Sequence, residues 1–304
     1  MGEKPLPWLL KIAIYNNIMV DNFKIAVIGS GTMGNGIAHV AAQSGFQTLL
    51  VDINQDQLNK ALSIISKNLD RQINKNIISE SEKQNIINNI SLETNLQNCK
   101  DMDLIIEAIP EKYDLKASIF KELDSICKES TILASNTSSI SISNLGNQTK
   151  RPENIIGMHF MNPVPVMKLI EVIKTMHTSE STIKTIIDIS KKMNKIPVEC
   201  NDYPGFISNR ILMPMINEAI FCLEQNVATK ESIDEIMKLG MAHPMGPLEL
   251  ADFIGLDICL DIMEVLWIGF NDSKYRPCTL LKTMVSSGLL GRKSGKGFYN
   301  YDWF

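Results

Sequence analysis

The feature that most constrains the fold is a glycine-rich loop that follows a short apolar run and precedes a helical segment. Residues 24–28 form a continuous apolar run of the kind found in buried parallel strands, and Gly29 ends it. The loop 29–34 has the spacing Gly-x-Gly-x-x-Gly, and a helical stretch over 37–44 follows it and ends at Gly45. A second apolar run, 48–52, completes a βαβ unit.

This unit predicts a dinucleotide site. Gly29 permits the tight turn, Gly31 lets the backbone approach a pyrophosphate, and Gly34 allows the helix to pack closely on the strand. Asp52 lies eighteen residues beyond Gly34, where a carboxylate can accept hydrogen bonds from a ribose and repel a 2′-phosphate, so NAD is favoured over NADP. The alternative is that the glycines only turn a corner and Asp52 caps the next helix. The residues expected to bind the cofactor here are Gly29, Gly31, Thr32, Met33, Gly34 and Asp52.

Strands and helices alternate along the next 150 or so residues, which predicts a doubly wound parallel sheet. A long helical pattern spans 54–89. Further strands are expected at 103–108, 132–135, 155–159, 167–173 and 196–200, and helices at 115–128 and 181–193.

The pattern becomes helical throughout after residue 206. Helices are expected at 207–224, 230–239, 248–270 and 280–286. The predicted fold is therefore α/β: a Rossmann-like, doubly wound parallel sheet over 23–200, then a smaller all-α domain over 201–304. Residues 1–22 form an N-terminal extension, interpreted either as a loosely docked tail or as the product of an upstream start codon.

Composition narrows the class of protein. Hydrophobic residues make up 44% and charged residues 21% of 304 residues, which excludes a disordered chain. A net charge of −4 gives no reason to expect nucleic acid as a partner. The six cysteines are scattered without metal-binding spacing, which favours reduced thiols and a cytoplasmic location. The same cysteine spacing gives no reason to expect a metal. The apolar run 8–14 is too short to span a bilayer, so no membrane is expected as a partner.

One histidine has a candidate partner. His159 ends an apolar run, and Glu171 lies twelve residues later within another. If these runs are adjacent strands, the carboxylate can fix the imidazole tautomer, and the other ring nitrogen can exchange a proton with a substrate hydroxyl. A purely structural pair is the alternative, and spacing alone leaves both open.

Two polar segments lie where a ligand could bind. Residues 135–139, Ser-Asn-Thr-Ser-Ser, follow a strand and so lie at the carboxyl edge of the sheet, although such residues also cap helices. Asn209 lies in the first turn of the helical domain, where it can hydrogen-bond a substrate or simply face solvent.

From about residue 23 to the end, the chain resembles the 3-hydroxyacyl-CoA dehydrogenase family, which includes 3-hydroxybutyryl-CoA dehydrogenases. The motifs that resemble the family are the glycine-rich segment 29–38, Glu-Ala-Ile-Pro-Glu at 107–111, residues 135–139, His-Phe-Met-Asn-Pro at 159–163, Pro-Gly-Phe at 204–206 with Asn209-Arg210, Gly-Pro-Leu-Glu-Leu-Ala-Asp at 246–252 and residues 291–299.

The resemblance implies roles for individual residues. It implies that His159 and Glu171 are a catalytic pair, with Ser138 and Asn209 beside the substrate. It also implies an NAD cofactor, and contacts to its nicotinamide side from Glu111, Lys116, Asn162 and Lys293. The implied reaction is the NAD-dependent interconversion of (S)-3-hydroxyacyl-CoA and 3-oxoacyl-CoA, at short chain length, in fatty-acid or butyrate metabolism. A homodimer is implied as well, with the helical domain mediating substrate binding and dimerisation.

A coenzyme A substrate needs basic residues for its phosphates. Lys60, Lys67 and Arg71 fall on one face of the helix after Asp52, and Lys60 and Lys67 are the expected phosphate contacts; a solvated charged face is the alternative. A relative that oxidises a free hydroxy acid or sugar acid would share the His–Glu pair. A nucleotide-responsive binding protein without chemistry is a third possibility, and the set Ser138, His159, Glu171 and Asn209 argues against it.

Overall fold

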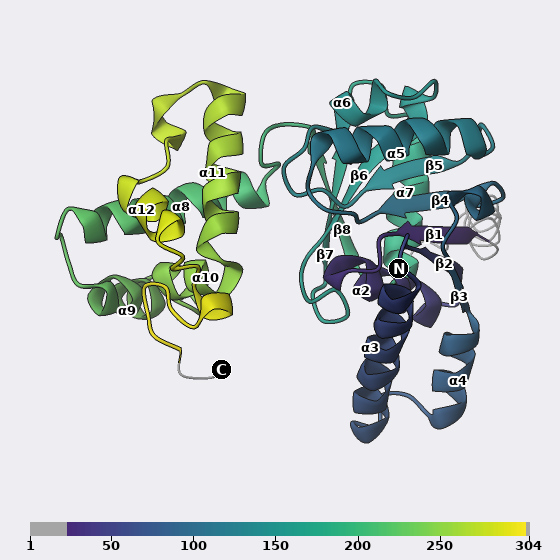
Figure 1. Cartoon of the computed structure of the whole chain (residues 1–304), viewed down its shortest axis with the longest axis horizontal. Helices are drawn as coiled ribbons and strands as arrows, with labels where there is room; N and C mark the ends of the chain where they lie inside the picture. Colours follow the sequence, from purple (N-terminus) through teal and green to yellow (C-terminus); the bar gives the residue numbers. More distant parts are fainter. Residues whose placement is uncertain (1–22, 302–304) are drawn as a thin grey trace, which may run out of the picture. The chain divides into compact units, whose positions relative to one another are not determined.

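The structure is a computed structural model that describes residues 23–301, and the expected N-terminal extension lies outside this range. The chain divides into two compact units, one ending at Asp202 and the other beginning at Tyr203. Figure 1 shows the sheet in the first unit and the helices of the second. Within the described part of the chain, every helix is too short or too polar to cross a lipid bilayer.

The first unit is built on an eight-stranded sheet with the order β3-β2-β1-β4-β5-β6-β7-β8. Neighbouring strands are parallel except β6 and β7, which are antiparallel. The predicted fold class is confirmed, with this one antiparallel pair as an addition. The strands are β1 (Lys24–Ile28), β2 (Gln47–Val51), β3 (Ile90–Glu93), β4 (Leu104–Glu107), β5 (Ile132–Ser135), β6 (Ile155–Phe160), β7 (Leu169–Lys174) and β8 (Ile196–Asn201).

Helices cover both faces of this sheet because successive residues of a strand face opposite sides. A Cβ placed on Gly157 would approach Ile142 of α6 (Ile142–Gly146). The next residue, Met158, belongs instead to the buried cluster that includes residues of α2 (Thr32–Gln43) and α7 (Glu180–Lys192). The His159 side chain, on the same face as position 157, therefore lies on the α6 side of the sheet, where α5 (Tyr113–Ile126) also packs against α6 (Figure 1).

The helical pattern over 54–89 was expected to be continuous, and this is wrong. It forms two helices, α3 (Gln55–Asn74) and α4 (Glu80–Asn88), separated by a turn in which Asn76 has a φ of 54°. Strand β3, which follows α4, was not predicted. It is a short strand at the edge of the sheet with no fully buried residue, so it lacks the apolar signature of the central strands.

The second unit is helical, as expected. Its helices are α8 (Ser208–Glu224), α9 (Lys230–Gly240), α10 (Pro247–Ile254), α11 (Leu256–Phe270) and α12 (Thr279–Ser286). The single helix predicted over 248–270 is wrong, because Gly255 adopts a φ of 107° and separates α10 from α11. L-residues with a side chain rarely adopt this conformation, so the glycine is the local cause of the break.

Two buried aspartates hold the end of the chain onto this unit. Asp252 accepts hydrogen bonds from the backbone N–H groups of Phe298 (3.0 Å) and Tyr299 (2.9 Å). Asp234 accepts from the N–H of Leu248 at 2.8 Å and from the Tyr299 hydroxyl at 2.8 Å. The motif over 246–252 is thus hydrogen-bonded to the motif over 291–299 through Asp252, so both motifs have a structural role in this unit.

Candidate active site

The glycine-rich loop forms the floor of a cavity of about 560 Å³. Gly29 has a φ of 97°, and a Cβ there would lie 2.7 Å from the Ala108 carbonyl oxygen. A Cβ on Gly34 would lie 1.7 Å from the Gly29 carbonyl oxygen, whereas one on Gly31 would meet nothing within 4 Å. Gly29 and Gly34 are therefore required by the fold itself, and Gly31 leaves open space at the start of α2, whose first N–H groups can bind a phosphate.

Asp52 lines the same cavity at the end of β2. Its Oδ2 accepts hydrogen bonds from Ser30 N (2.8 Å) and Ser30 Oγ (2.7 Å), and its Oδ1 accepts from Asn54 N at 3.1 Å. The side chain that caps α3 is Asn54, which accepts from the N–H groups of Asp56 and Gln57. The alternative interpretation, in which Asp52 caps that helix, is therefore wrong, and the carboxylate keeps acceptor capacity for a ribose hydroxyl.

His159 and Glu171 are brought together by the antiparallel pairing of β6 and β7. The two residues face each other in register, and His159 Nδ1 lies 2.8 Å from Glu171 Oε2. Both are buried, with exposed fractions of 7% and 4%. A carboxylate acceptor at Nδ1 places the proton there and leaves Nε2 as the nitrogen that can exchange a proton with a ligand.

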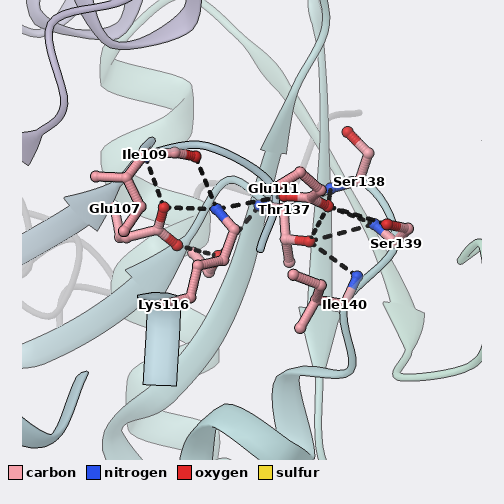
Figure 2. Close-up of polar contacts among 9 residues, drawn as sticks. Glu107, Ile109, Glu111, Lys116, Thr137, Ser138, Ser139 and Ile140 are labelled. Atoms are coloured by element: carbon pink, nitrogen blue, oxygen red, sulfur yellow. Dashed lines mark hydrogen bonds and ion pairs between the residues drawn. The ribbon is translucent and has the colours of Figure 1, made fainter. Parts of the chain in front are cut away.

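A buried ion pair lies beneath the carboxyl edge of the sheet (Figure 2). Lys116, in the first turn of α5, is 1% exposed, and its Nζ lies 2.6 Å from Glu107 Oε1. Glu107 also accepts from Ser135 Oγ at 2.6 Å and from Ile109 N at 2.7 Å. Lys116 therefore ties α5 to β4, and Glu107 ties β4 to β5. The predicted contact of Lys116 with the nicotinamide side stays a prediction.

Glu111 holds the segment that contains Ser138. Its Oε1 accepts hydrogen bonds from Ser138 N (2.9 Å), Ser139 N (3.1 Å) and the Thr137 hydroxyl, and its Oε2 lies 3.3 Å from Lys116 Nζ (Figure 2). Burial acts to raise the pKa of Glu111, but the Lys116 charge and these hydrogen bonds outweigh it and hold the pKa below its usual value. Glu111 is thus an ionised anchor for the Ser138 loop.

The other predicted residues lie in several places. Asn162 is exposed just after β6 and precedes Pro163 through a cis peptide bond. Lys60 and Lys67 are exposed on α3. In the second unit, Asn209 is buried in the first turn of α8, and Lys293 Nζ lies 2.5 Å from the Asp257 carboxylate.

Two polar residues near the site were not assigned a role from the sequence. Glu107 occupies the last position of a fully buried strand, and an ionisable residue within an apolar run is the signal that marks it. Asn136 accepts a hydrogen bond from Phe160 N at 2.9 Å through its Oδ1, and so joins the ends of β5 and β6. Among residues 23–301, no group of three or more His, Cys, Asp or Glu side chains is placed to hold a metal ion.

Comparisons with known proteins show the family of the chain. Residues 24–203 match the family model described as 3-hydroxyacyl-CoA dehydrogenase, NAD binding domain, and residues 205–301 match the C-terminal domain of the same family. The chain belongs to the 3-hydroxyacyl-CoA dehydrogenase family. The resemblance expected from the sequence is confirmed, and NAD is the cofactor of the first unit.

Individual relatives are similar over nearly their whole length. A protein of Bacillus subtilis named as a probable 3-hydroxybutyryl-CoA dehydrogenase is 53% identical over 92% of this chain and 97% of its own. A 3-hydroxybutyryl-CoA dehydrogenase of Clostridioides difficile is 50% identical over 92% of this chain and 99% of its own. The crystal structure of the (S)-3-hydroxybutyryl-CoA dehydrogenase of Ralstonia eutropha matches with a TM-score of 0.90 and 47% identity, over 92% of this chain and 99% of that one.

Proposed function

We propose that this chain catalyses the NAD-dependent interconversion of (S)-3-hydroxybutyryl-CoA and acetoacetyl-CoA. The observation that carries the proposal is the His159–Glu171 pair, 2.8 Å apart and buried at the carboxyl edge of the sheet that holds the glycine-rich loop. Ligands of open α/β sheets bind at this edge. The relatives named as acting on 3-hydroxybutyryl-CoA support the short chain length.

The residues have distinct tasks in this reaction. NAD, when bound, supplies a hydride acceptor for carbon 3 of the substrate. In oxidation, His159 Nε2 accepts the proton of the 3-hydroxyl group, and Glu171 stabilises the imidazolium through Nδ1. In reduction, the imidazolium returns the proton to the oxygen. Ser138, on its Glu111-anchored loop, and Asn209 orient the acyl oxygens.

The proposed cofactor contacts come mostly from the first unit. The N–H groups at the start of α2, from Thr32 to Gly34, hold the pyrophosphate, and Asp52 holds the adenosine ribose. Glu111, Lys116 and Asn162 are the proposed contacts on the nicotinamide side, and Lys293 is a further proposed contact. Lys60 and Lys67 on α3 are the proposed contacts for the substrate phosphates.

The test is the change in NADH absorbance with acetoacetyl-CoA, measured for the wild type and for His159→Ala. Loss of the general acid–base is expected to lower the rate by about a hundredfold or more. His177→Ala is the matched control, because His177 is exposed and lies outside the sheet. Equal rates in wild type and His159→Ala would refute the catalytic role. Turnover of a free hydroxy acid in place of acetoacetyl-CoA would keep that role and overturn the thioester assignment.

We also propose a homodimer formed through the helical unit. An apolar groove of about 690 Å³ lies along α8, the connection between α9 and α10, and α10, and its lining includes Ile211 (67% exposed) and Phe253 (53% exposed). Apolar patches of this kind mark interaction surfaces. Ile211→Lys is expected to give a monomer in sedimentation analysis, whereas Ile236→Lys, on α9 outside the groove, leaves the dimer intact; a dimeric Ile211→Lys would refute this interface.

A cytoplasmic location and a role in butyrate or fatty-acid metabolism complete the proposal. All six cysteines are free thiols in the structure, as expected of a reducing compartment. Cell fractionation with an antibody to the chain tests the location, and recovery of the chain outside the cytoplasmic fraction would refute it.

A further inference from the structure

Asp202, the last residue of the first unit, is held by the sheet through its backbone and by the start of α6 through its side chain. Its N–H donates to the Lys174 carbonyl at 3.0 Å, which continues the pairing of β8 with β7. Its Oδ2 accepts hydrogen bonds from Ser141 Oγ (2.8 Å) and Ser143 N (2.8 Å), and its Oδ1 accepts from Ile142 N at 3.1 Å. Ser141 is 61 residues away in the sequence, so these contacts join two distant parts of the chain.

The three hydrogen bonds fix the first turn of α6, which has only five residues. A helix of this length is marginal on its own, and the N–H groups of its first turn have no partner within the helix. Ser141, the N-cap, accepts from Asn144 N, and Asp202 accepts from the first two N–H groups. The helix dipole also favours a carboxyl group at this end. The start of α6 therefore depends on Asp202.

The segment that leads into α6 carries Ser138, and Glu111 holds this segment at a single atom. Glu111 Oε1 accepts from the Thr137 hydroxyl, Ser138 N (2.9 Å) and Ser139 N (3.1 Å) (Figure 2). Hydrogen bonds that converge on one atom fix one point of a segment, and a segment held only there can pivot about that point. A second contact is needed to fix its orientation.

Asp202 supplies this second contact. Ser141 lies three residues beyond Ser138, at most about 10 Å along an extended chain. We propose that Asp202 is a positioning residue, which sets the orientation of the Ser138 side chain by fixing the far end of the segment 138–141. This inference rests on the proposed function, in which Ser138 orients an acyl oxygen of the substrate. Loss of Asp202 should leave the dinucleotide cavity unchanged, because none of residues 137–143 lines it.

The test measures kcat with acetoacetyl-CoA and the Kd for NADH in Asp202→Ala. A displacement of about 1 Å in a substrate contact can lower the rate by up to about a hundredfold, so we expect kcat to fall by about tenfold. The Kd for NADH should stay at the wild-type value. Asp202→Asn keeps one acceptor oxygen, enough for the two hydrogen bonds that Oδ2 accepts, and should therefore recover part of the lost kcat.

Asp103→Ala is the matched control. Asp103 also accepts from a backbone N–H, that of Lys24 at 2.9 Å, and from the side chain of Lys128 at 2.6 Å. It precedes β4 and so lies at the amino edge of the sheet, whereas Ser138 follows the carboxyl end of β5. Its removal should lower the melting temperature but leave kcat unchanged. A loss of kcat that is equal in Asp103→Ala and Asp202→Ala would reflect destabilisation alone and would overturn the proposal.

Ser141→Ala breaks the 2.8 Å contact from the other side. Its kcat should fall by less than that of Asp202→Ala, because Asp202 keeps two of its three hydrogen bonds. In the double variant, kcat should be close to that of Asp202→Ala, since two residues of one contact do not act independently. Losses that multiply in the double variant would contradict the proposed contact.

Hydrogen exchange of backbone amides separates this inference from the proposed function. Peptides that cover residues 137–143 should exchange faster in Asp202→Ala than in the wild type, because the segment has lost one of its anchors. If the wild type does not reduce acetoacetyl-CoA but this segment exchanges faster in the variant, the reaction is wrong and the anchor stands. If the wild type reduces acetoacetyl-CoA and Asp202→Ala keeps the wild-type kcat, the positioning role is wrong and the reaction stands.

Discussion

Replacing Lys116 by methionine tests the interpretation that this lysine holds the site together from within the sheet. Methionine keeps most of the side-chain volume and removes the charge. The change deletes the 2.6 Å ion pair with Glu107, the 3.1 Å hydrogen bond to the Ile109 carbonyl and the 3.3 Å contact with Glu111. It leaves the Glu107 carboxyl group, which is 0% exposed, without its cation.

The size of the effect follows from what Glu107 retains. Removing one partner of a buried ion pair costs about 3–5 kcal/mol of unfolding free energy. Glu107 still accepts from Ser135 Oγ at 2.6 Å and Ile109 N at 2.7 Å, which places the loss near the lower end, about 3 kcal/mol. For a unit that ends at Asp202, this corresponds to a decrease of about 6–12 °C in melting temperature.

Urea unfolding, followed by circular dichroism, measures this loss. Lys121→Met is the matched control, because Lys121 is exposed on the same helix, and it should change the unfolding free energy by less than about 0.5 kcal/mol. Glu107→Gln/Lys116→Met removes both charges and should be more stable than Lys116→Met alone, since no charge is left unpaired. A loss below 1 kcal/mol for the single variant, or a double variant less stable than it, would refute the reasoning.

Three further changes have separable outcomes. Gly34→Ala is expected to lower the free energy of unfolding in urea by at least about 1–3 kcal/mol, because the new Cβ would overlap the Gly29 carbonyl. Gly31→Ala should fold normally and raise the Kd for NADH. Equal stabilities of the two variants would contradict this. Burial lowers the pKa of His39 to about 4, so the folded state binds fewer protons than the unfolded state below pH 6.5. Between pH 7 and pH 4.5, the free energy of unfolding of the wild type should therefore fall by about 2.5 kcal/mol more than that of His39→Gln. Parallel curves of unfolding free energy against pH for the two proteins would count against this. Glu111→Ala should lower kcat with acetoacetyl-CoA because the Ser138 loop loses its anchor, with little loss of overall stability; an unchanged kcat would argue against that role.

The sequence was most informative where local geometry and chemistry impose the same residue. The βαβ unit was predicted because Gly29 and Gly34 have no room for a side chain and the flanking strands are buried on both faces. The pairing of His159 with Glu171 also requires that their strands be neighbours, and the spacing of twelve residues does not show this. The antiparallel register of β6 and β7 places the two residues opposite each other.

Edge strands and helix breaks were harder to predict for physical reasons. β3 lies at an edge, has no fully buried residue and follows an Asn- and Ile-rich helical pattern that obscures its start. The break at Gly255 lies inside a continuous apolar periodicity, and a lone glycine is compatible with a helix interior at a cost of only about 1 kcal/mol. The role of Glu107 in the site could not be predicted from the sequence, because its partners, Ser135 and Lys116, lie on another strand and on a helix.

The arrangement around Glu111 connects two sets of residues that were predicted separately. One carboxylate accepts hydrogen bonds from the Ser138 loop through Oε1 and lies against Lys116 through Oε2, so a residue assigned to the cofactor also positions one assigned to the substrate. Because Lys116 is in turn held by Glu107, the position of Ser138 is set by buried charges within the sheet rather than by the exposed loop alone. A change at Lys116 should therefore affect kcat as well as stability, and rescue of stability by Glu107→Gln should not restore kcat, since Glu111 still lacks its cation. Recovery of both together would show that the loop is positioned independently of the Lys116 charge.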